Sequence, residues 1–258
     1  MFFRAVCTVA AFHLVCASAL AAWRDVYEAT VRVEVPGAAG SGIVFWVDDR
    51  FVWVLTNAHV VGRSRTARVI PFQDGRQLRP ASGTVTLRRM DGYTDAAVLR
   101  IPRQGWPGRL SFVPLSLAMP AQGQQIVTVG CPAADWPSLW HGTIKRVYWP
   151  HFSFFPGRAG ARDMMSGRSG SAICDVWGTK VIGLLTWYDP STRNGRAQII
   201  RFVIQRLWET RRDVPASSPR IPEHYVPLHW EGTAGELEEV DLPKTYPGKG
   251  TPAQQCPD

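Results

Sequence analysis

Cysteine and long hydrophobic runs are both scarce in this chain of 258 residues, and each scarcity excludes a class of protein. Two of the five cysteines, Cys7 and Cys16, fall within the first 21 residues. The other three are an odd number, which argues against a domain held together by a framework of disulfide bonds. The apolar run Ala5–Leu20 is shorter than the roughly 20 residues of a membrane-spanning helix, and His13 interrupts it.

The first 21 residues have the pattern of a secretory signal peptide. Arg4 supplies a positive charge at the start, the apolar run follows, and Ala19-Leu20-Ala21 is a small-x-small cleavage site. An uncleaved membrane anchor is the alternative, and the short, interrupted run favours cleavage. We therefore predict an exported protein, secreted or periplasmic, that has no stable membrane insertion once the signal has been removed.

Charge is limited in amount and unevenly spread. Charged residues make up 19% of the chain and apolar residues 45%, a balance typical of a folded globular protein. The net charge is +8, yet residues 213–258 carry eight acidic and three basic side chains. A basic body could bind anionic surfaces. Only four of the 29 basic residues are lysine, and we find no nucleic-acid-binding motif, so we expect no nucleic acid as a partner.

The body of the chain is predicted to be all-β, because short strand-like runs alternate with clusters of Gly, Pro, Asp and Asn. The expected strands are Ile43–Val47, Phe51–Leu55, Ala67–Ile70, Gly83–Arg89, Ala96–Ile101, Gln125–Gly130, Thr143–Tyr148, Ser171–Asp175, Lys180–Leu185 and Ala197–Ile200. The segment Pro102–Gln125, rich in proline and glycine, is expected to link two halves.

A single helix and a tail are predicted to follow the strands. Apolar residues at helical spacing predict a helix over Ile200–Arg212, with Arg211 and Arg212 favourably placed at its negative end. Residues 213–258 are rich in Pro, Glu and Gly and show no periodicity, so we predict an extended or disordered acidic tail and no second globular domain. The tail is interpreted as a solvated linker, the alternative being a segment that packs on the basic body, shields it or docks a partner.

Three segments carry the residues of a charge-relay hydrolase in a particular order. His59 closes an apolar run in TNAHVV (56–61), Asp95 opens one in TDAAVL (94–99), and Ser169 stands between glycines in SGRSGS (166–171). The order His, Asp, Ser is that of the chymotrypsin type, whereas α/β-hydrolases run Ser, Asp, His. A serine hydroxyl needs a base such as imidazole, whose reference pKa is about 6.5, and a carboxylate to orient that base. We therefore assign nucleophile, base and orienting acid to Ser169, His59 and Asp95.

Other candidates for these roles fit less well. Ser166 and Ser171 lack the pair of glycine flanks, and Asp91 precedes a glycine in a turn rather than a strand. The remaining histidines show no spacing that would support a metal site, so we expect neither a metal nor another cofactor.

In these segments the chain resembles trypsin-like serine proteases of the chymotrypsin fold. It is most similar to the protease domains of bacterial HtrA-type enzymes and to glutamyl endopeptidases, over roughly Gly40–Trp208. The shared segments include GSGIV, VTVGCP, GTI and VIGLLTW, which begin at residues 40, 127, 142 and 181. The resemblance does not extend to the PDZ domain that HtrA-type proteins carry after the protease domain.

The resemblance implies two Greek-key β-barrels, formed by residues 22–110 and by residues 111–212, the latter including the closing helix. The active site would lie in the cleft between them, with Ser169 contributed by the second barrel. The implied activity is endopeptidase cleavage of polypeptides through an acyl-enzyme, without a cofactor. A non-catalytic, protease-like binding protein that uses the basic surface is the alternative.

The resemblance also assigns roles around the nucleophile. The backbone N–H groups of Gly167 and Ser169 would form the oxyanion hole. Asp163 would be the floor of the primary pocket and select Arg or Lys, or else be a loop carboxylate paired with a nearby arginine. Substrate would also contact Thr186, Trp187 and Tyr188, of which Tyr188 would narrow the pocket. Glutamyl specificity is disfavoured, because no histidine occupies the region of residues 185 and 186.

Two features depart from the family pattern or stay open. Arg168 stands where family members usually have Asp or Asn, so activation by insertion of a new N-terminus is not expected. We expect Arg168 to point to solvent, the alternative being that it tunes substrate choice. The resemblance places Cys131 and Cys174 close together in the second barrel, either as a disulfide or as two small buried apolar residues, with Cys256 left over.

Overall fold

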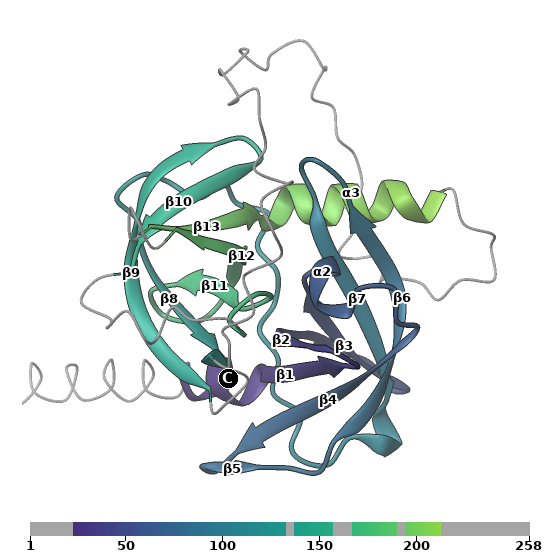
Figure 1. Cartoon of the computed structure of the whole chain (residues 1–258). Coiled ribbons are helices and arrows are strands. Elements are labelled where there is room, and N and C mark those ends of the chain that lie inside the picture. Colours follow the sequence, from purple (N-terminus) through teal and green to yellow (C-terminus); the bar gives the residue numbers. More distant parts are fainter. Residues whose placement is uncertain (1–22, 133–136, 157–166, 190–193, 213–258) are drawn as a thin grey trace, which may run out of the picture.

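The computed structural model describes residues 23–132, 137–156, 167–189 and 194–212. These residues form two antiparallel β-barrels side by side, with a helix that packs against both (Figure 1). The predicted signal peptide and acidic tail lie outside the described residues. No helix within the described ranges is both long and apolar enough to cross a membrane.

The first barrel comes from a stretch that is described without a gap. Its strands are β1 (Thr30–Val35), β2 (Ala38–Val47), β3 (Phe51–Thr56), β4 (Thr66–Gln73), β5 (Arg76–Gln77), β6 (Ala81–Met90) and β7 (Asp95–Pro102). They follow the order β1-β2-β3-β7-β6-β4-β5, and an additional pairing of β1 with β4 closes the barrel. The short helix α2 (Ala58–Val61) follows β3, so its residues lie at the end of a central strand pair.

The second barrel closes in the same way. Its strands are β8 (Gln125–Gly130), β9 (Ser138–Tyr148), β10 (His151–Phe155), β11 (Ala172–Asp175), β12 (Val181–Asp189) and β13 (Asn194–Ile199). They form a closed barrel in the order β10-β13-β12-β11-β8-β9. Helix α3 (Ile200–Arg212) follows directly and contacts β6 and β7 of the first barrel as well as β12 and β13 of the second.

The predicted all-β fold of two barrels with a closing helix is confirmed, and each of the expected strands corresponds to an observed one. Strands β1, β5 and β10, the short helix α2 and the helix at residues 23–29 were not predicted. The sequence of β1, TVRVEV, does alternate apolar and polar side chains, so its signal was present. Strand β10 has only five residues and is mostly aromatic, a pattern that periodicity alone does not assign to a strand.

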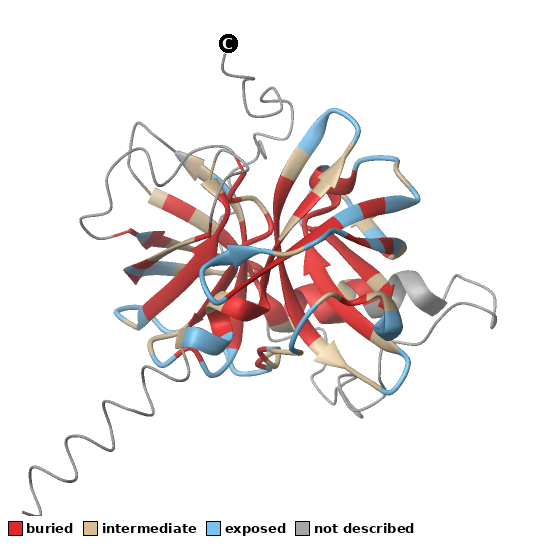
Figure 2. Ribbon diagram, turned by 90° about the horizontal axis from the view of Figure 1, so that it is seen from below, coloured by how far each residue is buried: buried red, intermediate tan, exposed pale blue. Residues whose placement is uncertain are grey.

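A continuous apolar core joins the two barrels. The larger cluster of buried side chains includes Leu55 and Leu99 of the first barrel together with Val129 and Leu184 of the second. Figure 2 shows the buried segments of both halves meeting at the centre of the molecule. A separate cluster fills the second barrel around Phe152 and Phe154. Because one core crosses between the barrels, apolar packing holds the two barrels together.

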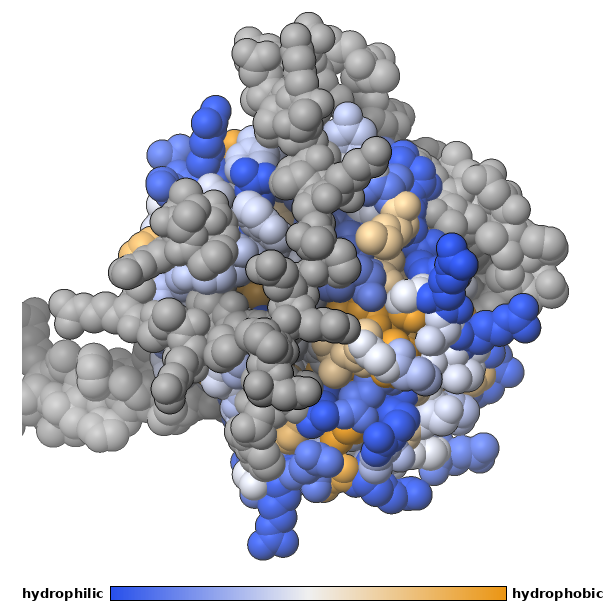
Figure 3. Space-filling model, in the orientation of Figure 1, coloured by the Kyte–Doolittle hydropathy of each residue, from blue (hydrophilic) through white to orange (hydrophobic). Residues whose placement is uncertain are grey.

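Apolar side chains make up a minor part of the described surface seen in Figure 3. On the face drawn in Figure 3, hydrophilic residues dominate the described surface and apolar ones form smaller areas among them. The exposed large apolar residues of the described chain are Met90, Tyr93, Phe112, Leu117, Met119, Phe155, Trp177 and Trp187. Some exposed apolar residues are normal on the surface of a globular protein.

The two barrel cysteines do not form a disulfide with each other. Cys174 lies in the core that joins the barrels, whereas Cys131 packs with Ile70 and Phe72 in a small cluster of its own. The structure therefore shows the second of the two alternatives, a pair of buried small side chains. Burial, together with the charge of Asp175, raises the pKa of the Cys174 thiol far above its ordinary value, so the thiol is protonated and unreactive at neutral pH.

The helix at residues 23–29 contacts both halves of the molecule. Trp23 donates its indole N–H to the Val176 carbonyl over 3.0 Å, and the Tyr27 hydroxyl donates to the Pro137 carbonyl over 2.8 Å. Both acceptors belong to the second half of the chain.

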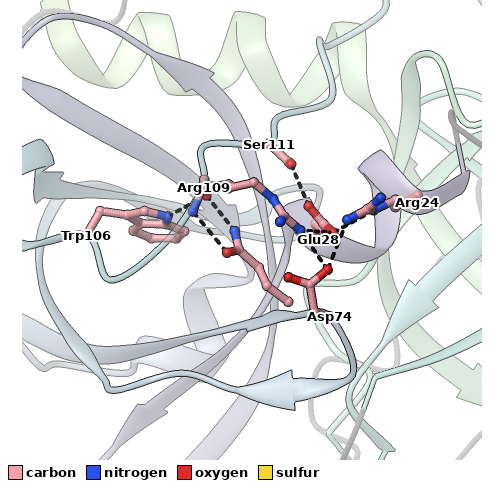
Figure 4. Close-up of polar contacts among 7 residues, drawn as sticks. Arg24, Glu28, Asp74, Trp106, Arg109 and Ser111 are labelled. Carbon is pink, nitrogen blue, oxygen red and sulfur yellow. Dashed lines mark hydrogen bonds and ion pairs between the residues drawn. The ribbon is translucent and has the colours of Figure 1, made fainter.

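On its other side the same helix is tied to the first barrel by a network of charges (Figure 4). The Glu28 carboxylate is 2.8 Å from Arg24 Nε and 2.8 Å from Arg109 Nη2, and the Ser111 hydroxyl donates to it. Asp74, in the turn after β4, pairs with the same two arginines. The Glu28 side chain is 7% exposed, so this network closes over a buried carboxylate. Burial alone would raise the Glu28 pKa, but the hydrogen bonds from both arginines outweigh it and hold the pKa below its ordinary value.

Glu28→Gln is expected to lower the free energy of unfolding at pH 7 by about 1.5 kcal/mol, a discounted value because both arginines are half-exposed. A lowered pKa in the folded state means that the stabilisation is present above the unfolded pKa and is lost as the pH falls. Urea unfolding at pH 7 and pH 3 should therefore show a difference between wild type and variant that shrinks in acid. Asp49→Asn, at a fully exposed carboxylate, is the control and should change little. An equal difference at both pH values would contradict this role for Glu28.

Candidate active site

The structure brings His59 and Asp95 into direct contact. His59 lies in α2, just after β3, and Asp95 is the first residue of β7. Strands β3 and β7 pair with Thr56 opposite Ala97, so their ends place the two residues next to each other. His59 Nδ1 is 2.5 Å from Asp95 Oδ2, and the His59 backbone N–H donates to Oδ1 over 2.9 Å. Both carboxylate oxygens thus bind one residue, which fixes the ring orientation.

This pairing determines the chemistry of the imidazole. A carboxylate at Nδ1 favours the tautomer with its proton on that nitrogen, which leaves Nε2 as the basic atom. Asp95 is buried, while the His59 side chain is 37% exposed. The ring is therefore held by Asp95 at Nδ1, while part of the ring remains accessible to solvent.

The loop that carries Ser169 is attached to both barrels. Ser41, in β2, donates its backbone N–H to the Ser169 carbonyl over 2.8 Å and its hydroxyl to the Gly167 carbonyl over 2.7 Å. From the second barrel, the Leu185 carbonyl accepts the N–H of Gly170 over 2.9 Å. The loop is thus attached both to β2 and to β12.

Close approach at this loop requires glycine. A Cβ atom on Gly170 would lie 2.1 Å from the Ser41 carbonyl oxygen, and the φ of this residue is +86°. A Cβ on Gly40 would lie 2.9 Å from the Ser169 carbonyl oxygen and still closer to the Val60 side chain. The backbones of the two barrels can therefore meet here only because side chains are absent.

The donors assigned to an oxyanion hole sit on this loop. Gly167 has φ of +101°, a left-handed conformation that glycine adopts readily. Within the described residues, no acceptor binds the backbone N–H of Gly167 or of Ser169. The Ser169 hydroxyl likewise makes no hydrogen bond to His59 or to another described residue. Such contacts are often long in enzymes without substrate.

Arg168 does not point to solvent, and that expectation is wrong. The residue is 2% exposed. Its guanidinium lies 5.1 Å from the centre of the Trp140 ring and donates to the carbonyl of Ser138 over 3.0 Å and to the hydroxyl of the same residue. The turn of the loop directs the side chain back into the second barrel, where the guanidinium contacts the Trp140 ring and the two oxygens of Ser138.

Two of the competing candidates have other roles in the structure, and the third, Ser166, lies outside the described residues. Ser171 is fully buried in the core, which excludes it as a nucleophile. Asp91 pairs with Arg89 at 2.7 Å and with Arg206 at 3.0 Å and accepts two backbone N–H groups of its own turn. Burial alone would raise the Asp91 pKa, but these hydrogen bonds hold it well below its ordinary value, so Asp91 is a structural carboxylate.

The residues expected to contact substrate lie partly within the described chain. Thr186, Trp187 and Tyr188 follow one another on β12, and the Trp187 ring is 39% exposed with the Arg196 guanidinium 4.8 Å from its centre. Asp163, the expected pocket floor, lies outside the described residues.

The histidines of the barrels offer no metal site. Burial and the nearby Arg196 lower the pKa of His151 to about 4, so this ring is neutral. His141 packs edge-on against Trp23. Among the described residues, no three His, Cys, Asp or Glu side chains gather where they could hold a metal ion.

Sequence reasoning missed three residues that hold this site together. Ser41 supports the loop of Ser169, Asn57 donates its side-chain amide to the Asp95 carbonyl over 2.7 Å, and Gln198 binds the Asp95 backbone. Ser41 and Asn57 lie inside the motifs GSGIV and TNAHVV, and this position could have marked them as residues that support the site. Nothing local distinguishes Gln198.

Gly170→Ala is expected to destabilise the protein more than Gly37→Ala, which is the matched control. Both glycines have positive φ, but nothing lies within 4 Å of a Cβ on Gly37. The control should therefore cost only the strain of a left-handed alanine, about 1–2 kcal/mol, and Gly170→Ala should add a backbone clash. Urea unfolding of both variants measures the difference. Equal losses of stability would show that the barrels do not need this close approach.

Comparison with protein families and solved structures agrees with this arrangement. The profile of the trypsin-like peptidase domain matches residues 40–184. The structure of Rv3671c from M. tuberculosis H37Rv, an inactive mutant form, is 19% identical with a TM-score of 0.57, and the match covers 76% of this chain and 92% of that one. The serine endoprotease from Yersinia pestis is 20% identical with a TM-score of 0.57, over 74% of this chain and 66% of that one. No curated protein sequence matches the chain.

Proposed function

The chain belongs to the trypsin-like peptidase family, and we propose that it is a serine endopeptidase in which Ser169, His59 and Asp95 hydrolyse peptide bonds of polypeptides. The observation that carries the proposal is the His59–Asp95 pair, in which Nδ1 lies 2.5 Å from a buried carboxylate. That contact is what a general base needs, because it orients the ring and stabilises the imidazolium that forms.

In the proposed acylation step, Ser169 Oγ attacks the carbonyl carbon of the scissile bond. His59 Nε2 accepts the hydroxyl proton and then gives it to the leaving amine, so that an ester with Ser169 remains. Water then attacks the ester, again with His59 as the base, and releases the acid. Asp95 stays ionised throughout and offsets the charge of the imidazolium.

The negative charge that develops on the carbonyl oxygen needs donors that are already in place. In the proposed mechanism these are the backbone N–H groups of Gly167 and Ser169. The hydrogen bonds from Ser41 to the same two residues hold the loop and support this role. Loss of one such donor typically costs about 3 kcal/mol of transition-state stabilisation.

A fluorophosphonate probe, which reacts with an activated serine, tests the proposal. Wild type should be labelled at Ser169, and Ser169→Ala and His59→Ala should abolish both labelling and cleavage of casein. Asp95→Asn should be severely impaired, because the wrong tautomer of His59 is favoured. The rate should also fall on acidification, since protonated imidazole cannot accept the serine proton.

Two controls separate this assignment from its alternatives. Asp91→Asn removes the neighbouring carboxylate and Ser82→Ala removes an exposed hydroxyl, and both should keep labelling and cleavage. If folded wild type were neither labelled nor active on casein, the chain would be a non-catalytic binding protein of the protease fold. If Ser169→Ala matched wild type, another nucleophile would carry the reaction.

A further inference from the structure

Gln198 holds the backbone of Asp95 from the opposite barrel. Its side-chain oxygen accepts the Asp95 N–H over 2.8 Å, and its amide nitrogen donates to the Asp95 carbonyl over 2.8 Å. The second proton of the same nitrogen goes to the Thr186 hydroxyl, also over 2.8 Å. Gln198 is fully buried. One side chain thus binds both polar groups of a single residue, as a neighbouring strand would.

The position of Gln198 in the second barrel is fixed on both sides. It lies in β13, opposite Leu184 of β12 and opposite His151 of β10. Asp95 begins β7 of the first barrel. The three hydrogen bonds of the amide therefore set the backbone of Asp95 against the strand pair β12–β13, across the boundary between the barrels.

The same strand pair also carries the other half of the site. The loop of Ser169 is attached to β12 through the hydrogen bond from Gly170 to Leu185. The Asp95 backbone is thus attached to β13 and the loop of Ser169 to β12, and these two strands are neighbours in the sheet. The His59 imidazole must bridge the distance between the Asp95 carboxylate and the Ser169 hydroxyl. That distance therefore depends on how β12 and β13 hold the two segments.

We infer that Gln198 is a positioning residue for the His59–Asp95 pair. The inference rests on the proposed function and adds a residue to it. Gln198 acts through Asp95 and is not itself a catalytic residue. Without the amide, the Asp95 N–H loses the acceptor that Gln198 provides, and the Asp95 carbonyl loses one of its two side-chain donors, the other being Asn57. Asp95 is then free to shift with β7.

The chain contains a matched control for this arrangement. Gln73, also buried, accepts the Arg109 N–H over 2.9 Å and donates to the Arg109 carbonyl over 2.5 Å. This is the same two-point contact between a glutamine amide and one backbone residue, and it ties β4 to the linker rather than to Asp95. Gln73→Met therefore loses the same kind of bonds without touching the candidate site.

The experiment compares Gln198→Met, Gln198→Glu and Gln73→Met with wild type in the full-length protein. Methionine keeps the volume and removes all three hydrogen bonds, while glutamate keeps the acceptor for the Asp95 N–H and, when ionised, removes the donors. Stability is measured by urea unfolding, and kcat and KM are measured on a peptide amide. A placement error near 1 Å costs on the order of 100-fold in rate. We expect kcat of both Gln198 variants to fall about 10- to 100-fold with little change in KM, and kcat of Gln73→Met to stay close to wild type at a similar loss of stability.

The outcomes separate the inference from the proposed function. If folded Gln198 variants keep the wild-type kcat, or if Gln73→Met loses as much kcat as they do, Gln198 is only a structural residue and the inference fails. The inference also fails if neither Gln198 variant folds while Gln73→Met does. Absence of fluorophosphonate labelling at Ser169 in the wild-type protein would instead contradict the proposed function. Labelling of the wild type is therefore tested first.

Discussion

Two hydrogen bonds from Ser41 join the barrels at the point where the candidate site lies. Ser41 is fully buried in β2, and its N–H and hydroxyl both donate to the loop of Ser169. It also receives bonds, because its hydroxyl accepts the Cys131 N–H and its carbonyl accepts the Thr56 hydroxyl. The backbone and side chain of this one residue thus connect β2 to β3, to the end of β8 and to the loop of Ser169. The flanking Gly40 is needed because no side chain fits between these segments.

The remaining contacts between the barrels keep this junction in place. A shared apolar core passes beneath it, helix α3 packs on strands of both barrels, and the helix at residues 23–29 binds carbonyls of the second half. Gln198 adds a further link, because its side-chain amide binds the backbone of Asp95 from β13. A residue of the first barrel therefore positions the loop of Ser169, and a residue of the second barrel positions Asp95. The candidate site is thus part of the interface between the barrels.

Features that depend on local sequence pattern could be predicted from the sequence. Strand periods and turn clusters predicted the all-β body, helical spacing predicted the closing helix, and the resemblance to trypsin-like serine proteases implied the two barrels. Features that depend on contacts between residues far apart in the sequence could not be predicted. Arg168 is buried because its guanidinium packs on the Trp140 ring and donates to Ser138, residues that lie about thirty positions earlier in the chain. Gln198 looks like any strand residue until β13 is placed beside β7. Whether Cys131 and Cys174 pair depends on geometry that spacing does not contain.

The central claim is that His59 is held by Asp95 as a base with its proton on Nδ1. Nitrogen NMR of histidine-labelled protein at a pH where the ring is neutral tests it most directly, because the two ring nitrogens report separately whether each carries a proton. The account predicts that the His59 Nδ1 is protonated and Nε2 is not, and that Asp95→Asn reverses or mixes the two forms. A His59 with its proton on Nε2 in the wild-type protein, or a tautomer that does not respond to Asp95→Asn, would contradict it.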